Sequence, residues 1–336
     1  MRGAPDDLLP ESLLDAVTRG WRERPVSLEY LPQGAGSHHW QLTGEDGSLR
    51  FVTVDDLDNK SWLPGGRDAV FDGLRRALTT ATVLRGQADL QFVVAPVADR
   101  DGELVRRLGD RYAVSVFPYL AGRSYAFGAH DDPWLRGVTL EMIAALHQAT
   151  PAVQDLAAQH VPGFGGRDDL EDFLADPRRP WDGGPYAASA HAVVAPRAAE
   201  LARLVDGFDR LVTATVRARA NPVITHGEPH PGNLMSVHGR VLLIDWDTVA
   251  LGPPERDMSL IAGPGTEDCD RYARLTGREL DPSVLMLYRL RWYLDDVASA
   301  VSMFRNPHRD TADVRSWRDS LAPQLEPLSS WLARLG

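Results

Sequence analysis

The spacing of hydrophobic residues changes character about one third of the way along the chain. Up to residue 117, apolar and polar positions tend to alternate with a period of two, which predicts β-strands. The strands predicted in this way lie at residues 26–31, 40–43, 49–54 and 112–117. Turns rich in glycine are predicted between the first three strands, at residues 32–39 and 44–47.

Most of the remaining chain follows the helical period, in which apolar residues recur three and four positions apart. One helix is predicted among the early strands, at residues 66–85. The other predicted helices lie at residues 134–150, 168–174, 187–218 (as one or two helices), 282–304 and 312–335. We therefore predict an α+β protein with two lobes. The β-rich lobe covers residues 1–117, a hinge covers 118–122, and a mainly helical lobe covers 123–336.

Composition places the chain among soluble globular proteins, because 43% of its 336 residues are hydrophobic and 25% are charged. No apolar run approaches the roughly 20 residues that cross a membrane, and the first residues lack the apolar core of a signal peptide. The single cysteine, Cys269, excludes an internal disulfide and is consistent with a reducing compartment. We expect a cytoplasmic protein without a membrane partner.

The net charge of −11 argues against nucleic acid as a partner, because phosphate backbones are bound by dense patches of Lys and Arg. An acidic protein favours a cationic small molecule instead.

The richest chemical pattern lies in residues 225–248, which read T-H-G-E-P-H-P-G-N-L-M-S-V-H-G-R-V-L-L-I-D-W-D-T. Glycines and prolines between His226 and Asn233 exclude a helix and predict a stiff loop. A hairpin with its turn at residues 238–239 follows, so that Asp245 returns to the same end as Glu228. Two carboxylates and an amide oxygen suit a hard divalent cation such as Mg²⁺.

The spacing within this segment matches a phosphoryl-transfer site. In protein kinases a carboxylate and an asparagine five residues later share the catalytic loop, and an aspartate after a buried strand holds the metal on the phosphates. Glu228 and Asn233 have that spacing, and Asp245 follows the apolar run 241–244.

A metal-dependent hydrolase built on His226, Glu228 and His230 is an alternative. The zinc deaminase signature, however, requires a Pro-Cys-x-x-Cys motif, and a helical H-E-x-x-H motif cannot form across Pro229 and Pro231.

The segment resembles the catalytic region of the aminoglycoside phosphotransferase family, whose usual form is H-G-D-x-H-x-x-N followed by I-D-W or I-D-F. The family consists of small-molecule kinases with a protein-kinase-like fold, and the resemblance implies that fold here. It also implies roles for Glu228 at the position of the catalytic base, for Asn233 and Asp245 as magnesium ligands, and for His226 and Asp257 as scaffold. Glu228 departs from the pattern, because glutamate carries one methylene more than the usual aspartate.

The resemblance extends to the first lobe, where it implies a nucleotide site for ATP or GTP. The glycine hairpin would cover the phosphates through Gly34, Gly36 and Ser37. The family carries a phosphate-binding lysine on the next strand, but this chain has Thr53 there, and the helix at residues 66–85 contains no glutamate to pair with a lysine. Arg75 or Arg76 of that helix, or Lys60 before it, would then supply the phosphate contact.

Two further sets of residues are implied by the same resemblance. The adenine ring would bond to the backbone of the hinge around Phe117 and Tyr119. An aminated substrate would meet acidic and aromatic side chains of the second lobe. The candidates are Glu255, Glu267, Tyr293, Asp295 and Asp296.

The sequence thus predicts a kinase that transfers the γ-phosphoryl group of ATP or GTP to a hydroxyl of an aminoglycoside-like or aminocyclitol-like amino alcohol. The glycine hairpin and hinge look most similar to the spectinomycin-type branch of the family. A catalytically impaired pseudokinase, which Thr53 and Glu228 together would allow, is the principal alternative, and the hydrolase is a lesser one.

Overall fold

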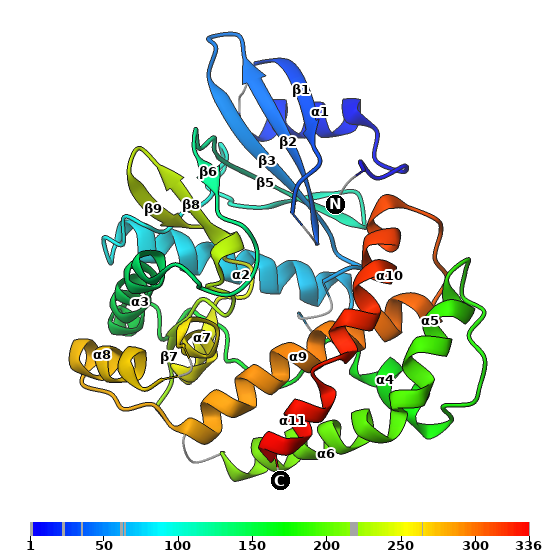
Figure 1. Ribbon diagram of the computed structural model, residues 1–336. Helices are drawn as coiled ribbons and strands as arrows, with labels where there is room; N and C mark the ends of the chain where they lie inside the picture. Colours follow the sequence, from blue (N-terminus) through cyan, green and yellow to red (C-terminus); the bar gives the residue numbers. More distant parts are fainter. Residues whose placement is uncertain are drawn as a thin grey trace. The chain divides into compact units, whose positions relative to one another are not determined.

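The computed structural model describes residues 3–21, 24–34, 36–60, 63, 65–215, 221–263 and 265–335. Its internal contacts divide the chain into two compact units. The first comprises Met1–His160 and Pro222–Leu280, and the second comprises Val161–Asn221 and Asp281–Gly336. The first unit holds the sheet and the loop from residue 225 onward, whereas the second is built from helices (Figure 1).

An antiparallel sheet of five strands forms the core of the first unit, in the order β1-β2-β3-β5-β4. The strands are β1 (Pro25–Leu31), β2 (Ser37–Gly44), β3 (Leu49–Asp56), β4 (Arg106–Leu108) and β5 (Tyr112–Pro118). The four strands predicted from the sequence are all present. The turn predicted at residues 32–39 is shorter, because Gly34 and Gly36 take up positive φ angles and β2 begins directly after them.

Each face of this sheet packs against one helix. The helix α1 (Pro10–Trp21), which was not predicted from the sequence, packs with Trp40, Val52 and Val114 on one face. The helix α2 (Arg67–Gly86), predicted at residues 66–85, packs with Ala113 on the other. Because neighbouring residues of a strand point to opposite faces, Thr53 and Asp55 of β3 lie on the α2 side.

The predicted hairpin is confirmed. It consists of β8 (Leu234–Val237) and β9 (Arg240–Leu243), with Leu234 opposite Leu243. His238 and Gly239 form the turn with φ angles of 48° and 77°. The short strand β6 (Arg123–Ser124) pairs with β8, and so connects the end of β5 to the hairpin.

The loop between Thr225 and Asn233 is held at both of its ends. The strand β7 (Val223–Thr225) precedes it and pairs with β10 (Ala250–Gly252), and a 3₁₀ turn (Pro231–Asn233) closes it. Among the described residues, this unit also contains the helices α3 (Pro133–Gln148), close to its prediction, α7 (Glu255–Ile261) and α8 (Glu267–Thr276). A 3₁₀ turn (Thr150–Ala152) follows α3.

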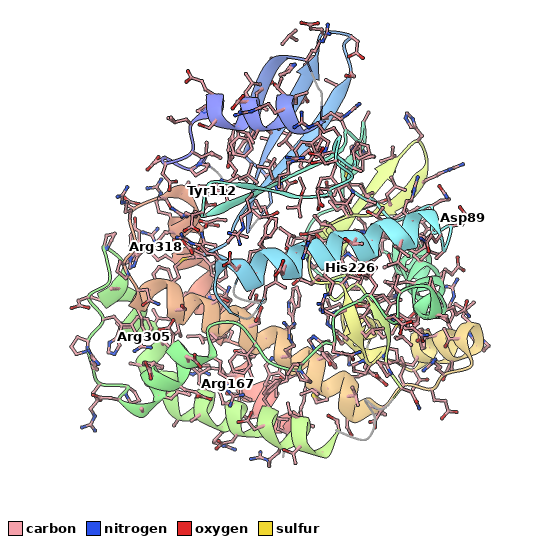
Figure 2. The ribbon with its side chains drawn as sticks, turned by 180° about the vertical axis from the view of Figure 1, so that it is seen from behind. Asp89, Tyr112, Arg167, His226, Arg305 and Arg318 are labelled. Carbon is pink, nitrogen blue, oxygen red and sulfur yellow. The ribbon has the colours of Figure 1, made fainter. Side chains whose placement is uncertain are left out.

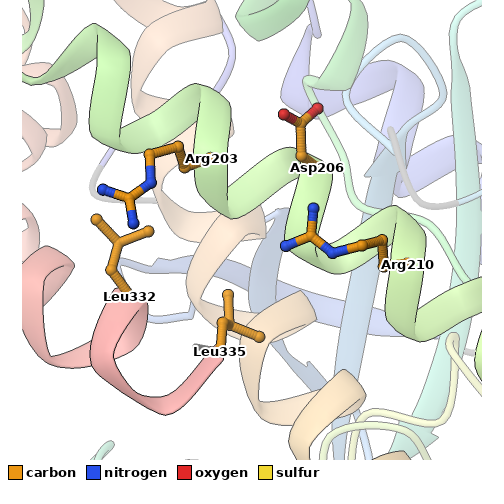
Figure 3. A pocket seen from close by; sticks show the side chains of 5 residues that line it. All are labelled: Arg203, Asp206, Arg210, Leu332 and Leu335. Atoms are coloured by element: carbon orange, nitrogen blue, oxygen red, sulfur yellow. The ribbon is translucent and has the colours of Figure 1, made fainter.

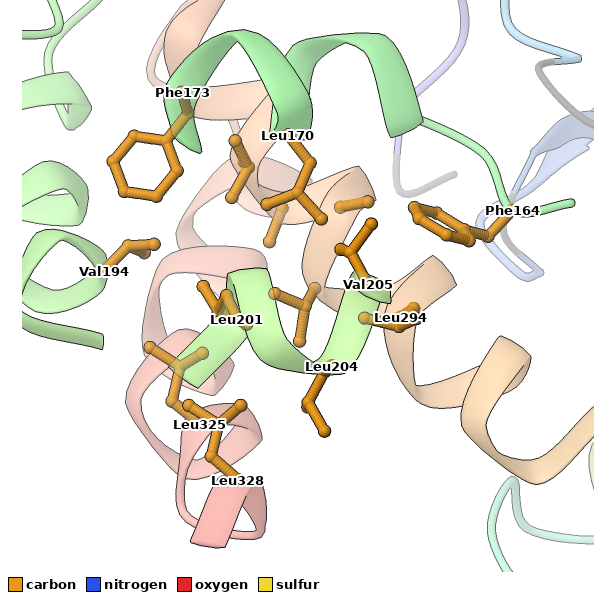
Figure 4. Close-up of a cluster of buried hydrophobic side chains, with 14 of the residues drawn as sticks. Phe164, Leu170, Phe173, Val194, Leu201, Leu204, Val205, Leu294, Leu325 and Leu328 are labelled. Carbon is orange, nitrogen blue, oxygen red and sulfur yellow. The ribbon is translucent and has the colours of Figure 1, made fainter. Parts of the chain in front are cut away.

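In the described part of the second unit, six helices surround one apolar core, in which Leu170, Phe173, Leu201 and Leu294 converge (Figure 4). They are α4 (Arg167–Ala175), α5 (Ala187–Val194), α6 (Ala198–Ala214), α9 (Pro282–Arg305), α10 (Ala312–Leu325) and α11 (Leu328–Leu335), and a 3₁₀ turn (Ala195–Arg197) joins α5 to α6. The single helix predicted at residues 312–335 is wrong, because the chain breaks at Pro327. Residues 216–218 of the predicted fourth helix lie outside the described residues.

Polar contacts reinforce this helical core at its surface. Arg167, at the start of α4, donates from both terminal nitrogens to Asp209 of α6 at 2.8 Å. Arg305, at the end of α9, donates to the backbone carbonyl of Asp169 on α4 (Figure 2). These bonds connect α4 to both of the long helices.

Two surface hollows lie away from the loop 226–233. One of about 180 Å³ lies between α6 and α11, lined by Arg203, Asp206, Arg210, Leu332 and Leu335 (Figure 3). Another, of about 440 Å³, borders α2. Neither is lined by a residue of the loop 226–233. Among the described helices, none is long and apolar enough to cross a membrane.

Candidate active site

A buried carboxylate fixes the start of the loop 226–233, which is the predicted catalytic loop. Asp257 of α7 accepts hydrogen bonds from the backbone N–H groups of His226, at 2.8 Å, and Gly227, at 2.6 Å. Its third donor is Nε2 of His147 on α3, at 3.1 Å. Burial by itself would raise the pKa of Asp257, but the bond from His147 and the nearby positive charge of Arg256 hold that pKa below its ordinary value. The carboxylate is therefore ionised and can accept all three bonds.

The ring of His226 is engaged on both sides. Its Nε2 donates to the carbonyl of Ile244 at 3.0 Å, and its Nδ1 accepts from the backbone N–H of Glu228 at 3.2 Å. Burial lowers the pKa of His226 to about 4, so the ring is neutral at pH 7. The ring, labelled in Figure 2, packs edge-to-face with that of Trp246, with 4.6 Å between the ring centroids. His226 thus joins the catalytic loop to the segment that carries Asp245.

Gly227 is required by the geometry of this loop. Its φ is +101°, and a Cβ at this position would lie 2.2 Å from a guanidinium nitrogen of Arg256. Arg256 donates to Thr225 Oγ1 at 2.7 Å and to the carbonyl of Thr248 at 2.9 Å. No role was predicted for Arg256 from the sequence, although it directly precedes Asp257.

The structure brings Glu228, Asn233 and Asp245 together. Asn233 donates from Nδ2 to the carbonyl of Glu228 at 3.0 Å, which turns its Oδ1 toward other partners. The backbone N–H of Ile244 donates to the carbonyl of Asn233 at 2.9 Å, so Asp245 is one residue away from that contact. Asp245 has a positive φ of 65°, a left-handed conformation that is uncommon outside glycine and that aspartate adopts more readily than most residues.

Asp245 lies in a strongly negative environment. Desolvation by the surrounding protein and the negative charge of Asp247, with smaller contributions from Glu228 and Asp55, raise the pKa of Asp245 well above its ordinary value, and Lys60 opposes them. The residue itself is exposed to solvent. Such a cluster of negative charge attracts a divalent cation.

These residues fit the Mg²⁺ ion that the sequence predicted. A carboxylate of Asp245 and the amide oxygen of Asn233 are hard oxygen donors, and Mg²⁺ commonly takes one or two protein ligands together with phosphate oxygens and water. The hydrolase alternative fits less well, since both ring nitrogens of His226 have backbone partners. Within the described residues, no group of three or more His, Cys, Asp or Glu side chains is arranged to hold a metal.

Lys60 lies beside this cluster and is almost fully buried, with 3% of its surface exposed. Its Nζ is 2.6 Å from Asp55 Oδ1, 2.8 Å from Asp247 Oδ2 and 3.1 Å from Ser37 Oγ. Burial would lower the pKa of Lys60, but Asp247, Asp55 and Asp245 together raise it above its ordinary value, so the ammonium stays charged. The roles of Asp55 and Asp247 were not predicted from the sequence, although Asp247 stands only two residues after Asp245.

The glycine hairpin lies over the same face of the sheet. Gly34 and Gly36 have φ angles of 73° and 88°, and Ser37 Oγ donates to Asp55 Oδ1 at 2.6 Å. Thr53 Oγ1 lies 3.3 Å from Nδ1 of His39. Burial lowers the pKa of His39 to about 4, so this ring carries no charge at pH 7 and does not replace a lysine.

The other predicted nucleotide contacts are distributed over the first unit. Phe117 pairs with Phe51 near the end of β5, and Tyr119 follows in the connection toward β6. Arg75 is bonded to Asp72 on the exposed face of α2, at 2.9 Å, and lines the hollow that borders this helix together with Arg76. The structure therefore places Lys60 next to Asp245 and its neighbouring acids, whereas Arg75 lies on the solvent-exposed face of α2.

The predicted substrate residues belong to both units. Glu255 is buried at the start of α7, and Glu267 is exposed at the start of α8. In the second unit, Tyr293 packs against the core and donates to the carbonyl of Gln324 at 2.9 Å. Asp295 accepts from the N–H of Gly165 at 2.5 Å, and burial together with Asp295 raises the pKa of Asp296 to about 6. A common substrate surface for these residues stays a prediction.

Known proteins share this fold over nearly the whole chain. The solved structure of spectinomycin phosphotransferase APH(9)-Ia, in complex with ADP and spectinomycin, has a TM-score of 0.72 and 15% sequence identity, with 98% of this chain and 99% of that chain covered. An amicoumacin kinase, hAmiN, in complex with AMP-PNP, Ca²⁺ and its ligand, has a TM-score of 0.54 and 15% identity, with 98% of both chains covered. The predicted protein-kinase-like α+β fold is thereby confirmed.

Sequence comparison identifies the family. Protein StrN of Streptomyces griseus is 26% identical over 310 residues, which cover 90% of this chain and 89% of StrN. The model of the phosphotransferase enzyme family matches residues 28–276, a range that contains the glycine hairpin, the catalytic loop, Asp245 and Asp257. The chain therefore belongs to the phosphotransferase enzyme family.

Proposed function

We propose that this protein is a small-molecule kinase that transfers the γ-phosphoryl group of ATP or GTP to a hydroxyl of an aminoglycoside-like or aminocyclitol-like amino alcohol. The observation that carries the proposal is the convergence of Glu228, Asn233 and Asp245 on one rigidly held loop and hairpin. Membership of a phosphotransferase family and the similarity in fold to an enzyme solved with ADP and spectinomycin agree with it.

Each of the three side chains would have its own task. Asn233 and Asp245 would hold Mg²⁺, which neutralises charge on the phosphates when bound. Glu228 would orient the acceptor hydroxyl and accept its proton. The side chain of glutamate reaches about 1.5 Å further than that of aspartate. The acceptor would therefore lie correspondingly farther from the loop backbone than in relatives that carry aspartate.

The charge of the protein supports an aminated acceptor. The chain has a net charge of −11, and three acidic residues act on Lys60 in the first unit, namely Asp55, Asp245 and Asp247. Glu228 adds its negative charge near Asp245. Such a field attracts a cationic molecule and repels an anionic one. We also propose that the protein acts in the cytoplasm, where ATP and GTP are available.

A nucleotide-binding protein with impaired chemistry is the second candidate. Thr53 and the uncharged His39 occupy the region of β2 and β3 where the family's lysine is expected. Such a protein would bind Mg²⁺ and nucleotide without transferring phosphate. Both candidates therefore predict binding of Mg²⁺ and nucleotide, but only the kinase predicts transfer of phosphate to an acceptor.

The test combines binding with turnover. Thermal unfolding is followed with ATP and with GTP, each with and without Mg²⁺, for the wild type, for Asp245→Ala and for the surface control Asp319→Ala. A ligand at 100 times its Kd stabilises the protein by about 2.7 kcal/mol. We expect Mg²⁺-dependent stabilisation in the wild type and the control, and its loss in Asp245→Ala.

Turnover is then measured as ADP or GDP release with spectinomycin and a panel of amino alcohols, with mass spectrometry of the acceptor. A mass increase of one phosphate establishes the kinase. Binding without any phosphorylated acceptor favours the second candidate, and the absence of any nucleotide shift at millimolar concentration refutes both.

A further inference from the structure

Lys60 is the only lysine among the 336 residues of the chain, which otherwise uses arginine as its cation. A long side chain with a charged end is rarely buried unless the charge is paired. Here the ammonium is buried and lies within 2.8 Å of two carboxylates, one from β3 and one from the segment after Asp245. Asp247 is 187 residues away in sequence, so the pair connects two distant parts of the site.

The loop that carries Lys60 is held in place by Asp56 at the end of β3. The side chain of Asp56 accepts from the backbone N–H of Asp58 at 3.1 Å and from Asn59 Nδ2 at 2.7 Å. Arg111 binds both of its carboxylate oxygens, at 3.0 and 2.6 Å. The turn before Lys60 is therefore fixed by side-chain bonds, and the lysine is presented from a defined position.

The acids of α2 have other partners. Asp68 is bonded to Arg107, and Asp72 is bonded to Arg75 at 2.9 Å. Lys60 is instead paired with Asp55, which lies two residues beyond Thr53 on the same face of β3. The arrangement provides a fixed ammonium on the catalytic side of the sheet without any contribution from an acid of that helix.

We propose that Lys60 is the phosphate-binding cation of this protein, presented from the loop after β3 in place of a lysine at position 53, and positioned by Asp55 and Asp247. This inference rests on the proposed function. Asp247 has the more exposed side chain of the two partners, 12% against 5%. A phosphate oxygen therefore takes the place of Asp247 on the ammonium, whereas Asp55 and Ser37 keep it in position.

The experiment measures the affinity of each variant for Mg²⁺-ATP and for adenosine, which has no phosphate. Lys60→Met and Lys60→Gln remove the charge, and Gln retains a hydrogen-bond donor toward Asp55. Arg75→Met removes the rival cation. Calorimetric titration supplies the Kd values, and circular dichroism checks folding.

We expect both Lys60 variants to bind ATP about 10- to 100-fold more weakly, as for a lost hydrogen bond to a charged group, and to bind adenosine within about twofold of the wild type. Arg75→Met should bind both ligands like the wild type. A merely structural lysine would weaken both ligands together, so the ratio of ATP to adenosine affinity is decisive in whichever Lys60 variant still binds adenosine.

An unchanged ratio in the Lys60 variants overturns the inference, and so does a loss of ATP affinity in Arg75→Met alone. Either result leaves the proposed function intact as long as the wild type binds Mg²⁺-ATP. A wild type that binds neither ATP nor GTP refutes the proposed function itself, and the inference with it.

Discussion

Replacing Asp257 by asparagine should loosen the catalytic loop while leaving the volume of the side chain at position 257 nearly unchanged. The two side chains have nearly the same size, so packing around α7 is preserved. The carboxylate accepts from His226 N and His147 Nε2 on one oxygen, and from Gly227 N on the other. In the variant one of these oxygens becomes an NH₂ group, which is a donor.

The magnitude follows from the loss of these acceptors. If the amide oxygen keeps the partners of Oδ2, the new NH₂ group faces the N–H of Gly227, and a buried donor is left without an acceptor. Such a group costs about 1–3 kcal/mol, and the two remaining bonds lose the strength that they gained from the negative charge. We expect the opening free energy of the loop to fall by about 2–4 kcal/mol.

Hydrogen exchange measures this change locally, which is useful because a chain with two compact units need not unfold in one step. Peptides that span residues 223–230 should exchange faster in Asp257→Asn, and kcat should fall by about 10- to 100-fold as the loop loses its fixed position. Asp209→Asn is the matched control, because its carboxylate binds Arg167 at the surface of the second unit. Unchanged exchange and kcat in Asp257→Asn would refute the role that we assign to this bond.

Two further predictions concern acid and backbone geometry. Burial lowers the pKa values of His39, His226 and His230 from 6.5 to about 4, so the unfolded chain binds protons at a higher pH than the folded chain does. The free energy of unfolding should therefore be highest above pH 6.5 and should fall as the pH drops toward 4, by up to about 3 kcal/mol per histidine. Urea unfolding that is unchanged between pH 7 and pH 5 would contradict this. Gly227→Ala should lower the free energy of unfolding, measured by calorimetry, by more than about 2 kcal/mol, because the new Cβ would clash with Arg256. Gly239→Ala should lower it by about 1 kcal/mol, because the space around Gly239 is open. Equal losses would show that Arg256 moves aside without any loss of stability.

Much of the first unit could be predicted from the sequence because its signals are local. The alternation in β3, the two-residue turn at His238-Gly239 and the apolar period of α2 each depend on neighbouring residues. The helix α1 was missed although its apolar positions recur with the helical period and its Leu13 and Val17 lie in the core. Ser37 was expected in the turn but begins β2, because Gly34 and Gly36 end the turn before it.

The site was predictable where one segment carries it and less so where distant segments meet. Glu228, Asn233 and Asp245 belong to one stretch of eighteen residues, and the structure brings them together. The partner of Lys60 is 187 residues away, and no local pattern distinguishes Lys60 from Arg75. Which of the two cations lies at the site depends on the bonds of Asp56, which fix the turn before Lys60, and on the face of α2 that is exposed to solvent.

A chain whose only lysine is buried has a useful experimental property. Amine-reactive reagents need an accessible, unprotonated amine, and Lys60 is enclosed as well as held in its charged form by three neighbouring acids. Lys60 can therefore be modified only when its contacts with Asp55, Asp247 and Ser37 break, so the rate of acylation at this position reports how often they break. Partner-mapping experiments on this protein should accordingly use carboxyl- or arginine-directed cross-linkers, since lysine-directed ones have no exposed side chain to attack.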